Sequence, residues 1–306
     1  MNILKKGIKY VTDRDYRWIV NSNLGFYNSM DDEKYVKEKY RACFGVYPDL
    51  ENPKGYVEKL QWLKLYYHNP KMTVCCDKYL VRDYIKEVIG EEYLIPLLGV
   101  YDSPDEIDFD ALPDRFVLKC NHNSGKGMYI CKDKSKMDVE KVKAGLRKGL
   151  KEDYFLTGRE WCYKNVPRKI ICEEYMEDSN GEFNDYKFYC NHGKAKDTLI
   201  CFDRFKSTHK NLHMSENWEI MPYNSSCEKA IEDGLTVPVP ENYEEMKSIA
   251  EKLSQGFPHV RMDMYDVDGR IYFGEFTFYS DSGYFRWLNG GDDFMGSDLI
   301  LPEKMK

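Results

Sequence analysis

Two carboxylates and an arginine are spaced so that a β-hairpin would bring them together. Arg261, Asp263 and Tyr265 alternate along one run that reads as a strand, and Glu275 and Thr277 alternate along the next. Because alternate residues of a strand point to one face, the hairpin can place Asp263 beside Glu275. Adjacent carboxylates repel each other unless a cation or a proton relieves them. Magnesium, held by one or two carboxylates and nucleotide phosphates, meets that need, so this pair is a candidate metal site.

A second candidate site follows a predicted strand that ends at Lys119. The loop after this strand, residues 121–127, contains Ser124, Gly125 and Gly127. A lysine together with backbone N–H groups of a small-residue loop can bind phosphates. The spacing is not that of the GxxxxGK[ST] phosphate loop. A tight hairpin loop with exposed polar side chains is the alternative interpretation.

A third group of polar residues lies at the end of another predicted strand and after the polar loop that follows it. An apolar strand that ends in acids can bind an adenine edge through its backbone and ribose hydroxyls through carboxylates. Solvated acids at a strand end are the alternative. The residues concerned are Glu173, Glu174, Tyr175, Met176, Asp185 and Lys187.

Other motifs add little. Residues 280–283 (SDSG) follow the hairpin and either contribute hydroxyls and N–H groups to its pocket or form a plain turn. His209 and His213 are spaced for zinc on a helix, but no third ligand stands at a recognisable spacing. The GxSxG elbow and the GxGxxG fingerprint are both absent. The sequence therefore gives no support for an α/β-hydrolase or a Rossmann dinucleotide-binding protein.

The segments that must position these side chains alternate between helical and extended patterns. Residues 1–70 read as helical, with Val57, Leu60 and Leu63 on one stripe. Strands in hairpins between helices predict α+β or α/β lobes around a cleft. Further helices are predicted over 77–88, 138–151 and 241–255, and strands over 94–100, 116–120, 128–131, 169–174, 186–190, 197–202, 259–265 and 270–276.

Composition restricts the class of protein. The 306 residues include 45 Lys and Arg against 52 Asp and Glu, a net charge of −7 that argues against a nucleic-acid binder. The same acidity disfavours a general affinity for acidic membranes or polyanions but leaves room for a local basic pocket. No apolar run reaches the length of a membrane span, so an integral membrane protein is not expected. Ten cysteines without a CxxC motif indicate buried thiols, and we expect a cytoplasmic location.

Taken in order, these pieces resemble ATP-grasp enzymes, and more closely the TupA-like ATP-grasp proteins associated with cell-surface polysaccharide and teichuronopeptide synthesis. The resemblance covers about residues 40–290 and leaves residues 1–40 outside. It rests on Asn52-Pro53, EKLQW at 58–62, Asp77-Lys78-Tyr79 with Arg82, GEEYLIPL at 90–97, Leu112-Pro113, FVLKCNH at 116–122, EEY at 173–175, Asp185-Tyr-Lys187, and the set of Arg261, Asp263 and Glu275.

The resemblance implies roles at the nucleotide. Lys78 and Lys119 match the lysines that approach the phosphates, and residues 121–127, with Ser124, Gly125 and Gly127, match the mobile glycine loop over them. Residues 173–176 match the adenine hinge, and Asp185 matches the acid at the ribose.

The resemblance also implies roles at the reacting groups. Lys187 stands where related enzymes carry a basic residue near the γ-phosphate and acceptor, and Arg261 matches the arginine expected to stabilise an oxyanion. Asp263 and Glu275 match magnesium ligands. Thr277 departs from the pattern, since many ATP-grasp enzymes have asparagine there, and the number of metal ions stays open.

The fold implied is two α+β lobes that grip ATP, with an N-terminal helical region. We expect a helical region over 1–75, a pre-ATP-grasp segment over 76–113, a small lobe over 114–176, and a large lobe with the metal and acceptor site over 177–306.

The activity implied is an ATP- and magnesium-dependent carboxylate–amine ligase that acts through an acyl phosphate and releases ADP and phosphate. A uronic acid of a nucleotide- or lipid-linked glycan is the expected carboxylate in surface (capsular) polysaccharide biosynthesis, with an amine acceptor and possible polysaccharide-assembly partners. A glycosyltransferase is the main alternative, although Asp266-Val-Asp268 before Gly269 reads as a hairpin turn and not as a DxD metal motif. A nucleotide-binding scaffold without catalysis is a third.

Overall fold

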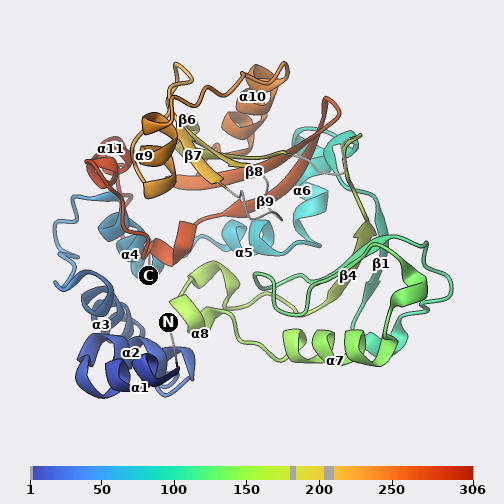
Figure 1. Ribbon diagram of the computed structural model, residues 1–306, viewed down its shortest axis with the longest axis horizontal. Coiled ribbons are helices and arrows are strands. Elements are labelled where there is room, and N and C mark those ends of the chain that lie inside the picture. Colours follow the sequence, from blue (N-terminus) through green and yellow to red (C-terminus); the bar gives the residue numbers. More distant parts are fainter. Residues whose placement is uncertain (1–2, 180–183, 203–209, 306) are drawn as a thin grey trace.

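The chain folds as an α+β protein around two antiparallel sheets (Figure 1). The computed structural model describes residues 3–179, 184–202 and 210–305. The strand order is β1-β4-β2-β3 in the small sheet and β7-β6-β5-β8-β9 in the large sheet. The predicted fold class of paired α+β lobes is therefore confirmed.

The small sheet consists of β1 (Leu97–Tyr101), β2 (Phe116–Cys120), β3 (Tyr129–Cys131) and β4 (Ile170–Glu174). Helix α7 (Val139–Leu150) runs beside it and shares a core with it through Phe116, Leu118, Val142 and Leu146 (Figure 1). Strand β1 comes from the segment predicted to precede the small lobe. Because β1 pairs with β4, residues 76–113 supply an edge strand to this sheet.

The large sheet consists of β5 (Asn184–Asn191), β6 (Lys194–Phe202), β7 (Lys210–Met214), β8 (His259–Val267) and β9 (Arg270–Thr277). Helix α10 (Tyr243–Leu253) covers one face, where the Tyr243 ring stacks on Phe188 with the ring centres 5.8 Å apart. Helix α9 (Ser225–Glu232) packs against β7. The buried core of this lobe includes Met246, Met262 and Met264.

Strand β7 was not predicted from the sequence. The structure describes residue 213 in this strand, whereas His209 lies outside the described residues. His213 is buried, and its Nδ1 lies 2.7 Å from Asp197 Oδ1. The described residues contain no group of three His, Cys, Asp or Glu arranged to hold a metal ion.

Six helices form the N-terminal region: α1 (Ile3–Thr12), α2 (Arg14–Asn23), α3 (Asp32–Phe44), α4 (Tyr56–Tyr66), α5 (Pro70–Cys76) and α6 (Val81–Val88). The predicted stripe of α4 is confirmed, since Val57, Leu60 and Leu63 are buried. None of the helices in the described ranges is both long and apolar enough to cross a membrane.

The helix predicted to start at Asp77 was placed too early. Helix α5 begins at Pro70, where the missing N–H of proline is no loss in a first turn. Asp77 ends α5, and its Oδ1 accepts from the backbone N–H groups of Tyr79 and Leu80. The next helix, α6, therefore starts only at Val81.

The remaining short helices are α8 (Phe155–Gly158) and α11 (Gly291–Gly296). All ten cysteines are free thiols in the structure, and nine of them are buried. Seven of them pack as small apolar side chains in the two cores, namely Cys75, Cys76, Cys131, Cys162, Cys172, Cys190 and Cys227.

A buried histidine joins α4 to the large sheet. His259 Nε2 lies 2.8 Å from the Tyr56 hydroxyl, and its Nδ1 lies 2.8 Å from Asn191 Oδ1. A neutral ring satisfies both contacts, because Nδ1–H can donate to the amide oxygen while Nε2 accepts from the hydroxyl. Burial and the nearby Arg261 charge lower the pKa of His259 to about 3.

The lowered pKa predicts an acid-sensitive stability. The free energy of unfolding should be fully retained above pH 6.5, the ordinary histidine pKa, and should fall as the pH drops from 6.5 towards about 3, because the unfolded chain binds the proton first. His259 can change the free energy of unfolding by at most about 1.4 kcal/mol per pH unit. Urea unfolding at a series of pH values between these limits should show a weaker pH dependence of the unfolding free energy for His259→Gln than for the native chain. An equal pH dependence of the unfolding free energy in His259→Gln and the native chain would contradict the assignment of this acid sensitivity to His259.

Candidate active site

Four charged side chains form a buried cluster on one face of the large sheet. Lys187 on β5 lies opposite Asp263 on β8 in the strand register, and its Nζ is 2.5 Å from Asp263 Oδ2 and 2.8 Å from Asp185 Oδ2. Arg261 holds the same carboxylate with two bonds, Nε to Oδ1 at 2.6 Å and Nη2 to Oδ2 at 2.7 Å. We call Asp185, Lys187, Arg261 and Asp263 the charge cluster. The backbone alternation of β5 and β8 places all four on one face.

The charge cluster remains ionised despite its burial. Burial alone would raise the pKa of Asp263, but the charges of Arg261 and Lys187 outweigh burial and lower it below 3.8. Burial would likewise lower the pKa of Lys187, yet the Asp263 and Asp185 carboxylates raise it above 10.5. Two cations and two anions therefore neutralise one another within the protein.

The predicted pairing of β8 with β9 is confirmed. Asp263 lies opposite Glu275, and Arg261 lies opposite Thr277. The register shifts just beyond these pairs, at Gly274, so that Met264 lies opposite Phe273. A Cβ at Gly274 would come within 2.8 Å of the Asp263 carbonyl oxygen, so the bulge needs glycine. Arg261 Nη2 also donates to Thr277 Oγ1 at 3.0 Å.

A second set of charges faces the large sheet from the small one. Lys119 Nζ lies 2.6 Å from Glu173 Oε2, and Arg82 Nη1 lies 3.4 Å from Glu173 Oε1. Lys78 reaches the large sheet, with its Nζ 3.7 Å from Glu275 Oε2. These residues meet because β2 and β4 are neighbours and α6 packs beside them. A narrow pocket between the sheets is lined by Lys78, Val81, Arg82, Leu94, Ile95, Lys119, Glu173, Phe273 and Gly274.

Sequence reasoning missed Arg82 as a site residue. Its guanidinium also donates to the Ile95 carbonyl oxygen at 2.8 Å, so it holds the chain that leads into β1. The available signal was its position four residues after Lys78, in a motif that had already been singled out.

The glycine loop between β2 and β3 has a fixed base and an open tip. Asn123 is buried at the base, and its carbonyl oxygen accepts from Lys78 Nζ at 2.8 Å. Gly127 has a φ of +75°, and a Cβ there would lie 2.9 Å from the Gly149 Cα of α7. Gly125 has a φ of +82° with open space around it, and Ser124 is exposed. Backbone N–H groups of the tip are therefore accessible to a ligand.

Not all predicted residues come together. Glu174 is exposed, and Tyr175 packs under Arg115, whose guanidinium carbon is 4.5 Å from the ring centre. Met176 is half-buried just after β4. Asp185, expected at a ribose, is 1% exposed and belongs to the charge cluster.

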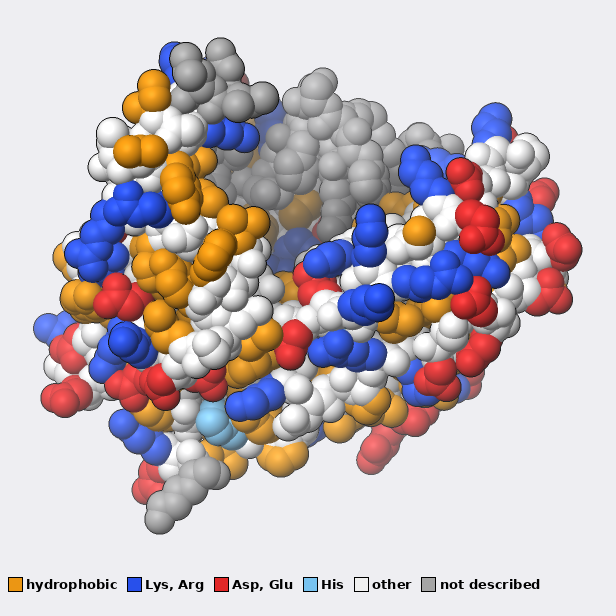
Figure 2. Space-filling view, turned by 90° about the horizontal axis from the view of Figure 1, so that it is seen from below, with side chains coloured by type: hydrophobic (Ala, Val, Ile, Leu, Met, Phe, Trp, Pro, Cys, Tyr) orange, Lys and Arg blue, Asp and Glu red, His pale blue; other side chains and the backbone are white. Residues whose placement is uncertain are grey.

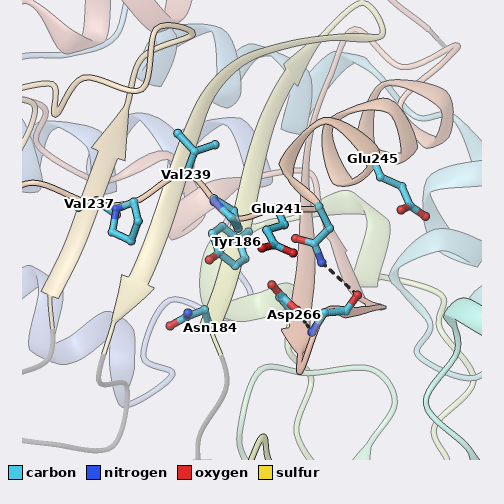
Figure 3. Close-up of a pocket in the computed structure, with 11 residues that line it drawn as sticks. Asn184, Tyr186, Val237, Val239, Glu241, Glu245 and Asp266 are labelled. Atoms are coloured by element: carbon cyan, nitrogen blue, oxygen red, sulfur yellow. Dashed lines mark hydrogen bonds between the residues drawn. The ribbon is translucent and has the colours of Figure 1, made fainter.

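The molecular surface is hollowed between its two sides, and Lys and Arg side chains follow the rim of the hollow (Figure 2). A different pocket opens on the α10 face of the large sheet, where Asn184, Tyr186 and Asp266 lie near Glu241 and Glu245 (Figure 3). Among the described residues that line it, none is a predicted site residue. Tyr186 and Lys187 are neighbours on β5 and so point to opposite faces of the sheet.

The carboxylates fit one magnesium ion. A carboxylate offers about four lone pairs, and Asp263 uses three of them, two on Oδ2 and one on Oδ1. Glu275 has a side chain that is 39% exposed and a single long contact to Lys78. Glu275 and the remaining lone pair of Asp263 thus leave room for an ion that also binds phosphates. Thr277 Oγ1 already accepts from Arg261, which makes it a poor additional ligand in this arrangement.

The two carboxylates should differ in their effect on stability. Asp263→Asn leaves Lys187 and Arg261 buried with less compensation, so the free energy of unfolding should fall by about 3–5 kcal/mol. Glu275→Gln removes only an exposed contact and should cost less than about 1 kcal/mol. Urea unfolding at neutral pH measures both variants. Equal losses would show that the charge cluster is not held by Asp263.

Solved structures that match the chain include a ligase and a synthetase. A D-alanine–D-alanine ligase from Bacillus anthracis, solved with ATP, is 13% identical with a TM-score of 0.40 over 81% of this chain and 63% of its own. D-cycloserine synthetase DcsG is 15% identical with a TM-score of 0.43 over 75% of this chain and 71% of its own. The present chain thus spans less than two thirds of the Bacillus anthracis ligase. No curated protein matches the chain.

A match to a protein family covers most of the chain. The TupA-like ATPgrasp family matches residues 58–300, which include every predicted site residue and both sheets. The chain therefore belongs to the TupA-like ATPgrasp family, and its two antiparallel sheets with their helices form an ATP-grasp fold.

Proposed function

We propose that this protein is an ATP- and magnesium-dependent carboxylate–amine ligase. Family membership supports ATP-dependent ligation in general. The observation that carries the proposal is the juxtaposition of the charge cluster and Glu275, all on the large sheet, with Lys78, whose Nζ lies 3.7 Å from Glu275 Oε2. Such an arrangement offers cations to a triphosphate on one side and to a carboxylate substrate on the other.

In this proposal the nucleotide lies between the two sheets. Lys78 and Lys119 bind the phosphates, and the N–H groups at Ser124, Gly125 and Gly127 cover them. The segment of residues 173–176 lies along the adenine. Since Lys119 and Arg82 both hold Glu173, that carboxylate orients the lysine before ATP arrives.

The position of Asp185 suits a contact with Lys187 better than a contact with a ribose. Its carboxylate is 1% exposed and lies 2.8 Å from Lys187 Nζ. We therefore assign it to positioning this lysine. Lys187 is then shared between Asp185 and Asp263 and presents its ammonium at a fixed point of the sheet.

Glu275 and Asp263 would hold magnesium, which when bound neutralises charge on the phosphates. The substrate carboxylate attacks the γ-phosphorus, an acyl phosphate forms and ADP leaves. The amine nitrogen then attacks the acyl carbon and phosphate leaves. Arg261 and Lys187 bind the carboxylate, and Arg261 stabilises the oxyanion that forms at the acyl carbon. Closure of the glycine loop keeps water from the acyl phosphate.

We further propose that the carboxylate is a uronic acid used in surface polysaccharide biosynthesis, as the resemblance implies. The division at residues 75, 113 and 176 is part of the same proposal. No observation on the described residues favours a glycosyltransferase, because Asp266 and Asp268 both already accept backbone hydrogen bonds. Asp266 Oδ1 accepts from the Gly269 N–H at 2.9 Å, and Asp268 Oδ1 accepts from the Ser179 N–H at 3.1 Å.

Removal of the strand-end lysine tests the phosphate site. Lys119→Ala should weaken ATP binding roughly 10- to 100-fold, because a hydrogen bond to a charged group contributes about 1.5–3 kcal/mol. Lys148→Ala, on the exposed side of α7, is the matched control and should bind ATP normally. Calorimetry with a non-hydrolysable ATP analogue and magnesium measures both. Normal affinity in a folded Lys119→Ala variant would place the phosphates elsewhere.

The products of the reaction test the proposed function itself. Lys78 and Lys119 concentrate positive charge on the outer phosphates, so a panel of uronic acids with amines should yield ADP and phosphate. Hydroxylamine should trap the sugar carboxylate as a hydroxamate when the amine is withheld. Chromatography separates the nucleotides. Accumulation of AMP would exclude the acyl phosphate, and ADP without a trapped carboxylate would indicate a kinase.

A further inference from the structure

The first two helices expose large apolar side chains on the outside of the molecule. Ile8 and Val11 of α1 are 57% and 72% exposed, and Leu24 and Phe26, just after α2, are 68% and 70% exposed. Contiguous exposed apolar patches on globular proteins mark interaction sites more often than isolated ones do. We call residues 3–28 the N-terminal hairpin.

The outward face of α1 is fixed by its contacts with α2. The Tyr10 hydroxyl donates to Asn21 Oδ1 at 2.7 Å, and Arg17 Nη1 donates to the Val11 carbonyl oxygen at 2.8 Å. Ile8 and Val11 are three residues apart and therefore neighbours on one side of the helix. Their exposure shows that this side does not pack on α2.

Aromatic contacts of α2 anchor the N-terminal hairpin to the rest of the protein. Trp18 is buried and stacks on Tyr27 with the ring centres 5.0 Å apart. The ring centre of Tyr35 in α3 lies 5.5 Å from that of Trp18, and the Tyr35 hydroxyl is 2.6 Å from Ser22 Oγ. The apolar side of α1 is thus held outward by a packed aromatic base.

The charge of the N-terminal hairpin is opposite to that of the whole chain. It carries five basic residues against two acidic ones, whereas the chain has a net charge of −7. Three of the basic residues, Lys5, Lys6 and Lys9, are exposed on α1, which contains no acid. Figure 2 shows hydrophobic side chains among Lys and Arg, together with some Asp and Glu, over the left side of the molecule, where Figure 1 places α1 to α3.

We propose that the N-terminal hairpin binds the surface of an anionic lipid bilayer. Helices that lie in a membrane interface combine an apolar side with lysines whose long stems reach the headgroups. The lysines of α1 complement anionic lipid, while the acidic remainder of the protein is repelled and stays in water. An exposed apolar helix side with lysines on the same helix suits a fluid anionic interface, which can close around the apolar side chains while its headgroups meet the lysines.

Sedimentation of the full chain with lipid vesicles tests this proposal. Binding should occur with vesicles of phosphatidylcholine containing about 30% phosphatidylglycerol, should be much weaker with phosphatidylcholine alone, and should fall in about 0.5 M salt. Ile8→Glu with Val11→Glu should lower the partition coefficient about tenfold or more. The matched control, Ile231→Glu with Leu235→Glu, alters two other exposed apolar residues and should bind like the native chain.

Three results would overturn the proposal. The native chain does not bind anionic vesicles, the α1 double variant binds as well as the control, or the native chain self-associates without vesicles and the α1 variant does not. The last result would identify the surface as a contact between copies of the chain. Urea unfolding verifies that both double variants are folded, so that a loss of binding reports on the surface alone.

Discussion

The structure depends on a buried set of ionised side chains, the charge cluster, on one face of the large sheet. Each buried ion loses several kcal/mol of hydration, which only close partners can offset. Asp263 has such partners because the register of β5 and β8 places Lys187 opposite it, and Arg261 reaches it from two residues away on the same strand. A shift of one residue in either strand would turn these side chains to the α10 face, so the cluster and the register determine each other.

Stability alone does not account for such a cluster. Apolar residues of similar volume often replace buried ion pairs with a gain in stability. The charge cluster also keeps a weakly used donor, because Arg261 Nη1 makes only a long bond of 3.3 Å to Ser280 Oγ. Beside the cluster, Lys78 Nζ donates to the Asn123 carbonyl oxygen at 2.8 Å and lies 3.7 Å from Glu275 Oε2, which leaves one of its three donors for a ligand. Cations that are fixed in place and still have hydrogen-bond donors to offer are suited to binding anions. This favours a role of these side chains in binding substrates over a role in folding alone.

Local periodicity explains what the sequence could predict. The alternation of Arg261, Asp263 and Tyr265 against Glu275 and Thr277 was enough to infer the shared face, and the structure confirms it. The bulge at Gly274 was not predictable, because its cause is the backbone of the opposite strand. In the same way, the helix expected at Asp77 starts later because the Asp77 carboxylate caps the turn and also accepts from Asn121 Nδ2.

Contacts between distant segments explain what the sequence could not predict. Glu173 follows an apolar strand and looks like a solvated acid, but β4 lies beside β2, which brings Lys119 within 2.6 Å of it. Arg82 arrives from α6, and nothing in its own neighbourhood reveals that contact. Patterns within a strand specify faces, whereas the order of strands in a sheet decides which charges meet.

The N-terminal helices divide into a part that builds the site and a part that does not. Gln61 and Lys64 of α4 hold the turn after β9, with Gln61 Nε2 donating to the Gly283 carbonyl oxygen at 2.7 Å and Lys64 Nζ to the Ser282 carbonyl oxygen at 2.5 Å. Asp281 and Ser282 in that turn have left-handed backbones, which such bonds help to maintain.

Helix α4 therefore belongs to the site, and the family match begins within it, at residue 58. Helices α1 to α3 lie before that match, and α1 packs mainly on α2. Because their outer surface contributes no residue to the charge cluster or the facing lysines, its exposed apolar and basic side chains need an explanation of their own, and contact with a charged interface supplies one that leaves the active-site geometry unchanged.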